Sequence, residues 1–145
     1  MGETRVQGFF FEDLKLGQTA ETTRVVTGAD IAAFAAVSGD SNPLHLDEAY
    51  ARTTAFGGRI AHGMLSAGFI SAVLGVKLPG PGAIYLSQNL RFRRPVKIGD
   101  LVTARVTVSE LNERRGHATL GTRCLVDGKA VLDGEAVLMV PRRNA

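Results

Sequence analysis

The segment GDSNPLHLD, residues 39–47, concentrates side chains that can move protons in a chain that is otherwise apolar at this point. Asp40 and His45 flank Pro43, which fixes its own φ angle and biases the preceding residue toward extended backbone. A carboxylate beside an imidazole can hold the ring in one tautomer or exchange a proton with it, and histidine titrates near neutral pH. We therefore consider Asp40 and His45 a candidate catalytic pair. The alternative is a capped helix end with a surface histidine, because Asp, Asn and Ser are common turn residues.

A second motif, AHGM at residues 61–64, opens a long apolar segment. If this segment is a helix, its first backbone N–H groups lack partners and the positive end of its dipole points outward. Gly63 has no side chain to block an approach to its N–H group, which could stabilise charge on a carbonyl oxygen. We count His62 with the candidate substrate-binding residues. The alternative is that Gly63 serves packing and that His62 caps the helix or faces water.

The N-terminal half is expected to hold one strand and three helices. Thr27 followed by Asp30 is typical of a helix N-cap with an acidic residue in the first turn, and Gly39 is typical of a helix C-terminus. The apolar segment is small and hydrophobic on nearly every face, which indicates a buried helix that Pro79 and Pro81 end. The expected elements are a strand over 14–27 and helices over 29–39, 47–55 and 61–78.

After Pro81 the spacing of apolar residues changes from helical to extended. Val102, Ala104, Val106 and Val108 alternate with polar residues, which is the period of a half-buried strand. Asp-Gly at 127–128 is a strong hairpin signal. The C-terminal half therefore predicts an antiparallel meander, with an extended run at 83–96 and strands at 101–111, 117–126 and 129–140.

A buried helix followed by a meander indicates an α+β domain in which the sheet wraps around that helix. An earlier N-terminal strand could complete the sheet. One face of the helix would stay partly uncovered, and open sheet edges invite pairing. We therefore expect one domain over residues 1–145 that forms a homodimer or a higher homo-oligomer.

Composition excludes several classes of protein. The chain has 145 residues, a net charge of +3, one cysteine and no tryptophan. A single cysteine excludes an intramolecular disulfide, and together with the absence of a signal-peptide pattern it favours a cytoplasmic location. The mild positive charge suits an anionic ligand but does not indicate nucleic-acid binding, and no apolar run is long enough to span a membrane. The lone Cys124 is expected to be buried in a strand.

Three stretches resemble the MaoC-like, (R)-specific enoyl-CoA hydratases. GDSNPLHLDEAYARTTAFGGRIAHGMLSAGFISAVLG resembles the signature of that family, FFEDLKLGQ resembles its usual opening, and LPGPGAIYLSQNLRFRRPVKIGD extends the likeness. Together they place residues 9–140 within the resemblance. The resemblance implies the hot-dog fold, which is a long central helix wrapped by a curved antiparallel sheet and usually paired as a dimer.

The resemblance also implies roles for individual residues. The catalytic aspartate and histidine of the family fall on Asp40 and His45, and the N–H group expected to bind the thioester carbonyl falls on Gly63. Asn42 matches the asparagine of the motif and is expected to order the loop or the water. Ser71 matches a pocket serine of some members. Taken as sequence alone, Ser71 is only a small residue on a buried helix.

The implied reaction is the reversible hydration of a trans-2-enoyl-CoA to an (R)-3-hydroxyacyl-CoA. Asp40 and His45 would hold one water, with base and acid not assigned between them. Three alternatives stay open: a 3-hydroxyacyl dehydratase acting on acyl carrier protein, an acyl-CoA thioesterase of the same fold, and a non-catalytic acyl-CoA binding subunit.

No cofactor is expected, because coenzyme A belongs to the substrate, and the three histidines show no metal-ligand spacing. The basic residues of LRFRRPVK could meet the phosphates of coenzyme A, since guanidinium groups suit phosphate oxygens; they are Arg91, Arg93, Arg94 and Lys97, of which Arg91 and Arg93 are the candidates we select. Strand alternation would place the basic residues of this segment on different faces, so they cannot all serve one ligand. The alternative is a solvated strand end.

Overall fold

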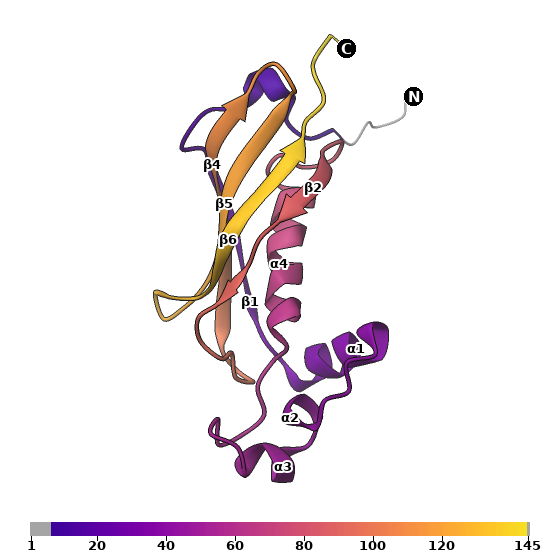
Figure 1. The fold of residues 1–145 in the computed structure, drawn as a ribbon, viewed down its shortest axis with the longest axis vertical. Helices are drawn as coiled ribbons and strands as arrows, with labels where there is room; N and C mark the ends of the chain where they lie inside the picture. Colours follow the sequence, from indigo (N-terminus) through magenta and orange to yellow (C-terminus); the bar gives the residue numbers. More distant parts are fainter. Residues whose placement is uncertain (1–6, 145) are drawn as a thin grey trace, which may run out of the picture.

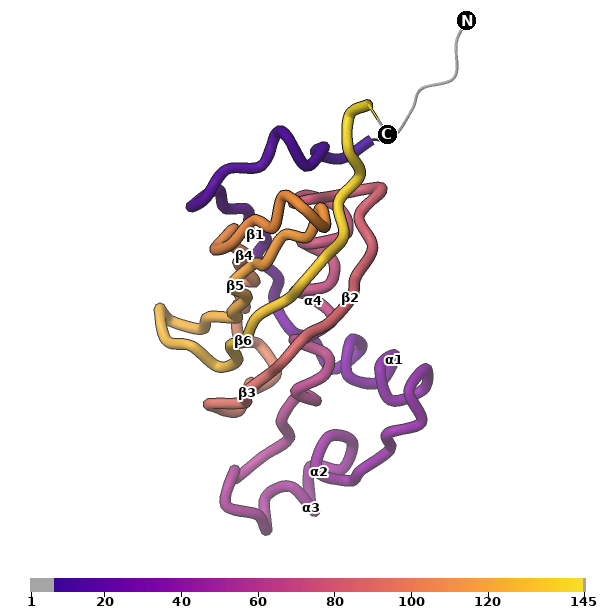
Figure 2. The backbone as a smooth tube through the Cα atoms, turned by 45° about the horizontal axis from the view of Figure 1, so that its top comes forward, coloured from indigo at the N-terminus to yellow at the C-terminus, as the bar shows by residue number. Residues whose placement is uncertain are grey.

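The computed structural model describes residues 7–144, and its main feature is a six-stranded antiparallel sheet curled around one helix. Figure 1 shows this helix, α4, lying along the sheet, and Figure 2 shows the sheet bending around it from β1 to β2. The predicted α+β architecture is therefore confirmed. The strands are β1 (Thr19–Val25), β2 (Ile84–Gln88), β3 (Arg91–Phe92), β4 (Leu101–Asn112), β5 (His117–Val126) and β6 (Lys129–Met139).

The strand order is β1-β4-β5-β6-β2, with β3 also pairing with β6. β4, β5 and β6 form the predicted meander, and the N-terminal strand β1 pairs antiparallel with β4, as expected. The extended run at 83–96 is divided into β2 and β3, and the pairing of β2 with β6 shifts register between Tyr85 and Ser87. The strand predicted over 14–27 is shorter at both ends, because a turn at residues 16–17 precedes it and it ends at Val25; a 3-10 helix at Phe11–Asp13 lies before the turn.

The core lies between the inner face of the sheet and α4 (Gly63–Val76). The alternation in β4 is confirmed, because Val102, Ala104, Val106 and Val108 are all buried. From the helix, Ser66, Ile70, Val73 and Leu74 are the buried residues. The Asp-Gly hairpin is also confirmed, since both central residues have positive φ, as a type I′ turn requires.

α4 is covered on one face only. The opposite face exposes Met64 (54%) and Val76 (71%), with Gly68, Ser71 and Ala72 between them. The expectation that one face stays uncovered is therefore confirmed. The helix ends at Val76, before the two prolines that were expected to stop it.

Three short helices form a separate layer beyond the end of the sheet (Figure 1). They are α1 (Gly28–Ser38), α2 (Pro43–Leu46) and α3 (Glu48–Arg52). The predicted cap of α1 is confirmed: the Thr27 side chain accepts from the Asp30 N–H, and the Asp30 carboxylate accepts from the Thr27 N–H. The Arg24 guanidinium, which donates to Asp30, holds the pKa of that carboxyl below its usual value. α3 is shorter than predicted, and the segment expected to be a loop contains the one-turn helix α2.

Cys124 is fully buried in β5, as expected for a strand cysteine. Its thiol donates to the backbone oxygen of Ser66 across 3.4 Å. Burial raises the pKa of the thiol to about 12, so the thiolate that would react with electrophiles is scarce at neutral pH. Within residues 7–144, none of the helices has the length and hydropathy needed to cross a membrane.

Candidate active site

The end of α1 places Asp40 at the site. Gly39 adopts the left-handed conformation that ends many helices, and its N–H donates to the Ala35 oxygen. The Asp40 N–H then donates to the Ser38 hydroxyl at 3.1 Å. The Asp40 carboxylate accepts from the Asn42 N–H at 3.3 Å, which orients it within the turn. The carboxylate is thus held by local bonds while the residue stays open to solvent.

His45 is held from the interior. Pro43 occupies the first turn of α2, where its missing N–H costs nothing, and the Asn42 side chain accepts from the Leu44 N–H. His45 lies in the last turn and is only 9% exposed. Its Nδ1–H donates to the Ile60 carbonyl oxygen at 2.8 Å, since a carbonyl can only accept. In the neutral ring the proton therefore sits on Nδ1, and Nε2 carries the lone pair.

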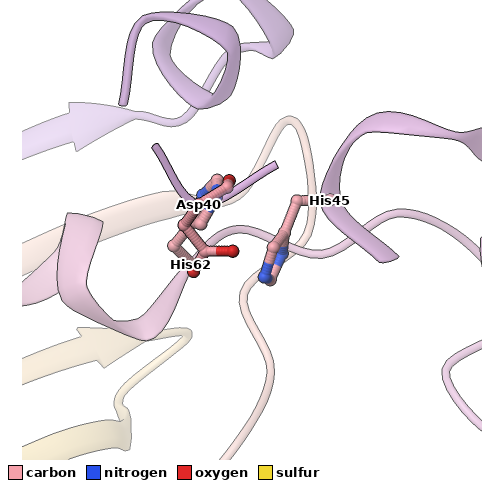
Figure 3. Close-up of side chains that lie close together, drawn as sticks. All are labelled: Asp40, His45 and His62. Carbon is pink, nitrogen blue, oxygen red and sulfur yellow. The ribbon is translucent and has the colours of Figure 1, made fainter. Parts of the chain in front are cut away.

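Asp40, His45 and His62 form one cluster (Figure 3). One ligand atom from each of the three side chains lies within 4.8 Å of the others. A carboxylate oxygen of Asp40 is directed toward the imidazole of His45. A carboxylate and an unprotonated ring nitrogen at this separation can both bond to one water molecule, which is the arrangement that general base catalysis requires.

The N-terminus of α4 lies beside this cluster. His62 occupies the N-cap position but its side chain makes no capping bond to the helix. The Leu65 N–H donates to the His62 oxygen, whereas the Gly63 and Met64 N–H groups have no partner among the described residues and are left to a ligand at the positive end of the helix dipole. A side chain at position 63 would meet the Phe92 ring at 2.4 Å, so glycine is needed for close approach.

These groups line one pocket of about 460 Å³, a volume suited to an acyl group. Asp40, His45 and Gly63 contribute to one part of its lining. The apolar part comes from residues on several elements, namely Phe56, Ile60, Met64, Phe92, Val131 and Leu132. The pocket therefore combines a proton-handling pair and N–H donors with space for a hydrocarbon chain.

A family model described as MaoC like domain matches residues 12–128, which is most of the chain. The chain belongs to the MaoC-like domain family. The match includes the signature segment that carries Asp40, His45 and Gly63.

Named relatives of this MaoC-like chain are close in sequence and in structure. An (R)-specific enoyl-CoA hydratase of Rhodospirillum rubrum is 57% identical over 93% of this chain and 94% of its own length. A 3-hydroxybutyryl-CoA dehydratase of Methylorubrum extorquens is 51% identical over 93% of this chain and 86% of its own. The solved R-hydratase PhaJ1 from Pseudomonas aeruginosa is 49% identical and superposes with a TM-score of 0.89, covering 95% of this chain and 89% of that one. The hot-dog fold that the resemblance implied is thereby confirmed.

Of the other residues that the sequence singled out, some line the pocket and others do not. Asn42 is exposed and caps α2, so it orders the turn and does not line the pocket. Ser71 is exposed on the uncovered face of α4 and is also not among the lining residues. Arg93 lines the pocket and pairs with Asp133 at 3.1 Å, whereas Arg91 is exposed and does not line it. The expected contacts of Ser71 and Arg91 with substrate stay predictions.

Ser66 and Phe92 line the pocket but were not assigned to the site from the sequence. Ser66 is 2% exposed, lines the pocket, and is the serine of α4 that faces inward. Phe92 covers Gly63, and Arg94 lies at the pocket without an ion pair among the described residues. Ser66 follows His62 by four residues and so shares its helix face, but the sequence does not indicate that this face points inward.

The cluster has the donor types of a transition-metal site but a poor geometry for one. The His45 and His62 rings are stacked, with centroids 3.8 Å apart and an interplanar angle of 28°. The lone pairs of an imidazole lie in the plane of its ring, so two nearly parallel rings direct them side by side and not toward a common ion. We derive no step through a metal, and the expected lack of a cofactor stays a prediction.

Gly63→Ala is expected to lower kcat/KM by about 10²-fold, since a misplacement of about 1 Å at a reacting centre has that cost. The added methyl group would displace the Phe92 ring or the start of α4. Steady-state kinetics measure the loss, and the double variant Gly63→Ala/Phe92→Ala should recover part of it. Equal activity in the single and double variants would contradict the steric explanation.

Proposed function

We propose that this protein catalyses the reversible hydration of trans-2-enoyl-CoA thioesters to (R)-3-hydroxyacyl-CoA. The observation that carries the proposal is the meeting of the Asp40 carboxylate and the His45 imidazole in an apolar pocket beside the uncapped start of α4. The names of the relatives from Rhodospirillum rubrum and Methylorubrum extorquens support the same reaction in its two directions.

The tautomer of His45 favours one assignment of roles. Because Nδ1–H is bonded to the Ile60 oxygen, Nε2 can take a proton from a bound water. The Asp40 carboxylate accepts the second hydrogen of that water and orients it. As the water oxygen bonds to C3, the proton on His45 Nε2 passes to C2, so the atoms of one water are added and the ring returns to its starting state. The oxygen that bonds to C3 and the hydrogen that bonds to C2 arrive from the same side of the alkene, which gives syn addition.

The start of α4 stabilises the charge that forms during this step. Attack at C3 moves electrons onto the thioester oxygen, and a backbone N–H aimed at that oxygen is worth about 3–4 kcal/mol in comparable sites. The Gly63 N–H is the donor we assign, since no side chain caps α4. The apolar lining then receives the acyl chain.

Hydration of crotonyl-CoA by the purified protein tests the proposal, with loss of the enoyl absorbance as the signal. A thiol reagent in a parallel reaction detects release of free coenzyme A. Loss of the enoyl group with no thiol release is expected. Thiol release without hydration would indicate a thioesterase, and binding without turnover would indicate a non-catalytic acyl-CoA binding subunit. Comparing the hydration rates of crotonyl-CoA and of the crotonyl group on acyl carrier protein shows which carrier is preferred.

Arg93 and Arg94 are the basic residues that line the pocket, and we propose that they meet the phosphates of coenzyme A. Arg94→Gln is expected to raise KM for crotonyl-CoA by about tenfold, the cost of one hydrogen bond to a charged group. The same variant should leave KM unchanged for crotonyl-N-acetylcysteamine, which lacks the phosphates. Arg114→Gln, in an exposed turn residue that does not line the pocket, is the matched control. An equal change for both substrates would contradict the phosphate contact.

The uncovered face of α4 and the edge strand β2 support a homodimer, since β2 exposes Ile84, Tyr85 and Leu86 beside it. Light scattering should give a mass of at least twice 15.4 kDa. Ala72→Glu, on the exposed face, should shift the protein to the monomer mass, and an unchanged mass would contradict this interface.

We propose a cytoplasmic location, consistent with the single buried thiol.

A further inference from the structure

His62 is the buried member of the cluster, with only 2% of its surface exposed. Its Nε2 atom lies 2.9 Å from the backbone oxygen of Asp40. That oxygen can only accept, so the proton of His62 sits on Nε2, the opposite tautomer to His45. The bond joins the N-terminus of α4 to Asp40, two residues beyond the end of α1, across 22 positions of sequence.

The same ring also supports the second member of the pair. The His62 and His45 rings stack at 3.8 Å, and the Phe34 ring of α1 packs against His62 at 4.8 Å. One side chain therefore contacts the backbone of Asp40 and the imidazole of His45 together (Figure 3).

His62 is also among the residues that line the pocket. Its Nε2–H donates to the Asp40 oxygen, and Nδ1 is buried without a hydrogen-bond partner in the described part of the chain. An unpartnered buried polar atom costs about 1–3 kcal/mol, so an apolar residue of the same size would be favoured if this position served packing alone. What the histidine supplies beyond packing is the Nε2–H donor.

We propose that His62 is a positioning residue for the hydration reaction: its Nε2–H fixes Asp40 and its ring supports His45, so that both can hold one water. This inference rests on the proposed function and gives His62 a role other than substrate binding. His62→Leu removes the donor at similar volume, whereas His62→Gln keeps an amide N–H at nearly the same reach.

Kinetics of the two variants test the inference with the full-length protein and crotonyl-CoA. His62→Leu should lower kcat by about 10²-fold and change KM by less than about threefold, whereas His62→Gln should stay within about tenfold of wild type. Equal kcat in both variants, a loss confined to KM, or wild-type activity in His62→Leu would overturn the inference. Wild-type protein without hydratase activity would instead overturn the proposed function.

A second measurement does not depend on activity or on the variants folding. Nitrogen-15 spectra of the histidine rings report which nitrogen carries the proton. The expected result is a proton on Nε2 of His62 and on Nδ1 of His45. A proton on Nδ1 alone at His62 would overturn the inference, because the bond to Asp40 would then be absent.

Discussion

Asp40→Asn is expected to lower kcat/KM for crotonyl-CoA by about 10²–10⁴-fold, the range of general acid–base contributions. The amide can still accept from the Asn42 N–H through its oxygen, so the turn should persist. What is lost is the negative charge that orients the attacking water and balances the proton held by His45. The free energy of unfolding should change by less than about 0.5 kcal/mol, as for most exposed substitutions.

Asp47→Asn is the matched control, because Asp47 lies in the same segment and caps α3 without lining the pocket. Its activity should equal that of wild type. If Asp40→Asn were as active as this control, the carboxylate would have no part in the chemistry. Urea unfolding of both variants separates lost catalysis from lost stability.

His45→Asn is expected to lower kcat/KM by a similar factor of about 10²–10⁴. The asparagine amide can replace Nδ1–H as a donor to the Ile60 oxygen, but it has nothing in place of Nε2. Alanine would be a worse choice, because it would leave that buried oxygen unpaired at a cost of about 1–3 kcal/mol.

Wild-type kcat/KM in His45→Asn would show that another group is the base. His117→Asn, far from the pocket on β5, provides the matched control.

The sheet could be predicted from the sequence because its signals are local. The buried alternation in 102–108 is complete on one face, and Asp127-Gly128 provides the positive φ angles that the hairpin adopts. The cap of α1 is equally local, with Thr27 and Asp30 three positions apart. Asn42-Pro43 also carried a helix-start signal, and interpreting it only as a stiff loop missed α2.

The inward face of α4 could not be predicted in the same way. The helix is small and apolar all round, so nothing in its pattern selects one side. Ser71 and Ser66 are therefore equivalent by composition, and only the packing of β4, β5 and β6 turns Ser66 inward and leaves Ser71 exposed. The existence of an uncovered face, in contrast, could be predicted, because a single sheet can cover only one face of α4.

The pair itself was predictable, but its supports were not. Asp40 and His45 are close in sequence and share one turn. Their supports come from distant positions: Ile60 accepts from the His45 ring, the Arg59 guanidinium donates to the His45 oxygen at 2.6 Å, and His62 donates to Asp40. These contacts exist only because the loop before α4 folds back over α2, and no periodicity in one sequence reports that.

The stereochemistry of addition in deuterium oxide tests most directly whether one water is held by Asp40 and His45. Crotonyl-CoA should give (R)-3-hydroxybutyryl-CoA with a single deuterium at C2, on the same face as the new hydroxyl group. NMR coupling constants of the product identify that face. An anti product, an (S) alcohol or a mixture of faces would contradict a single water delivered from one side of the pocket.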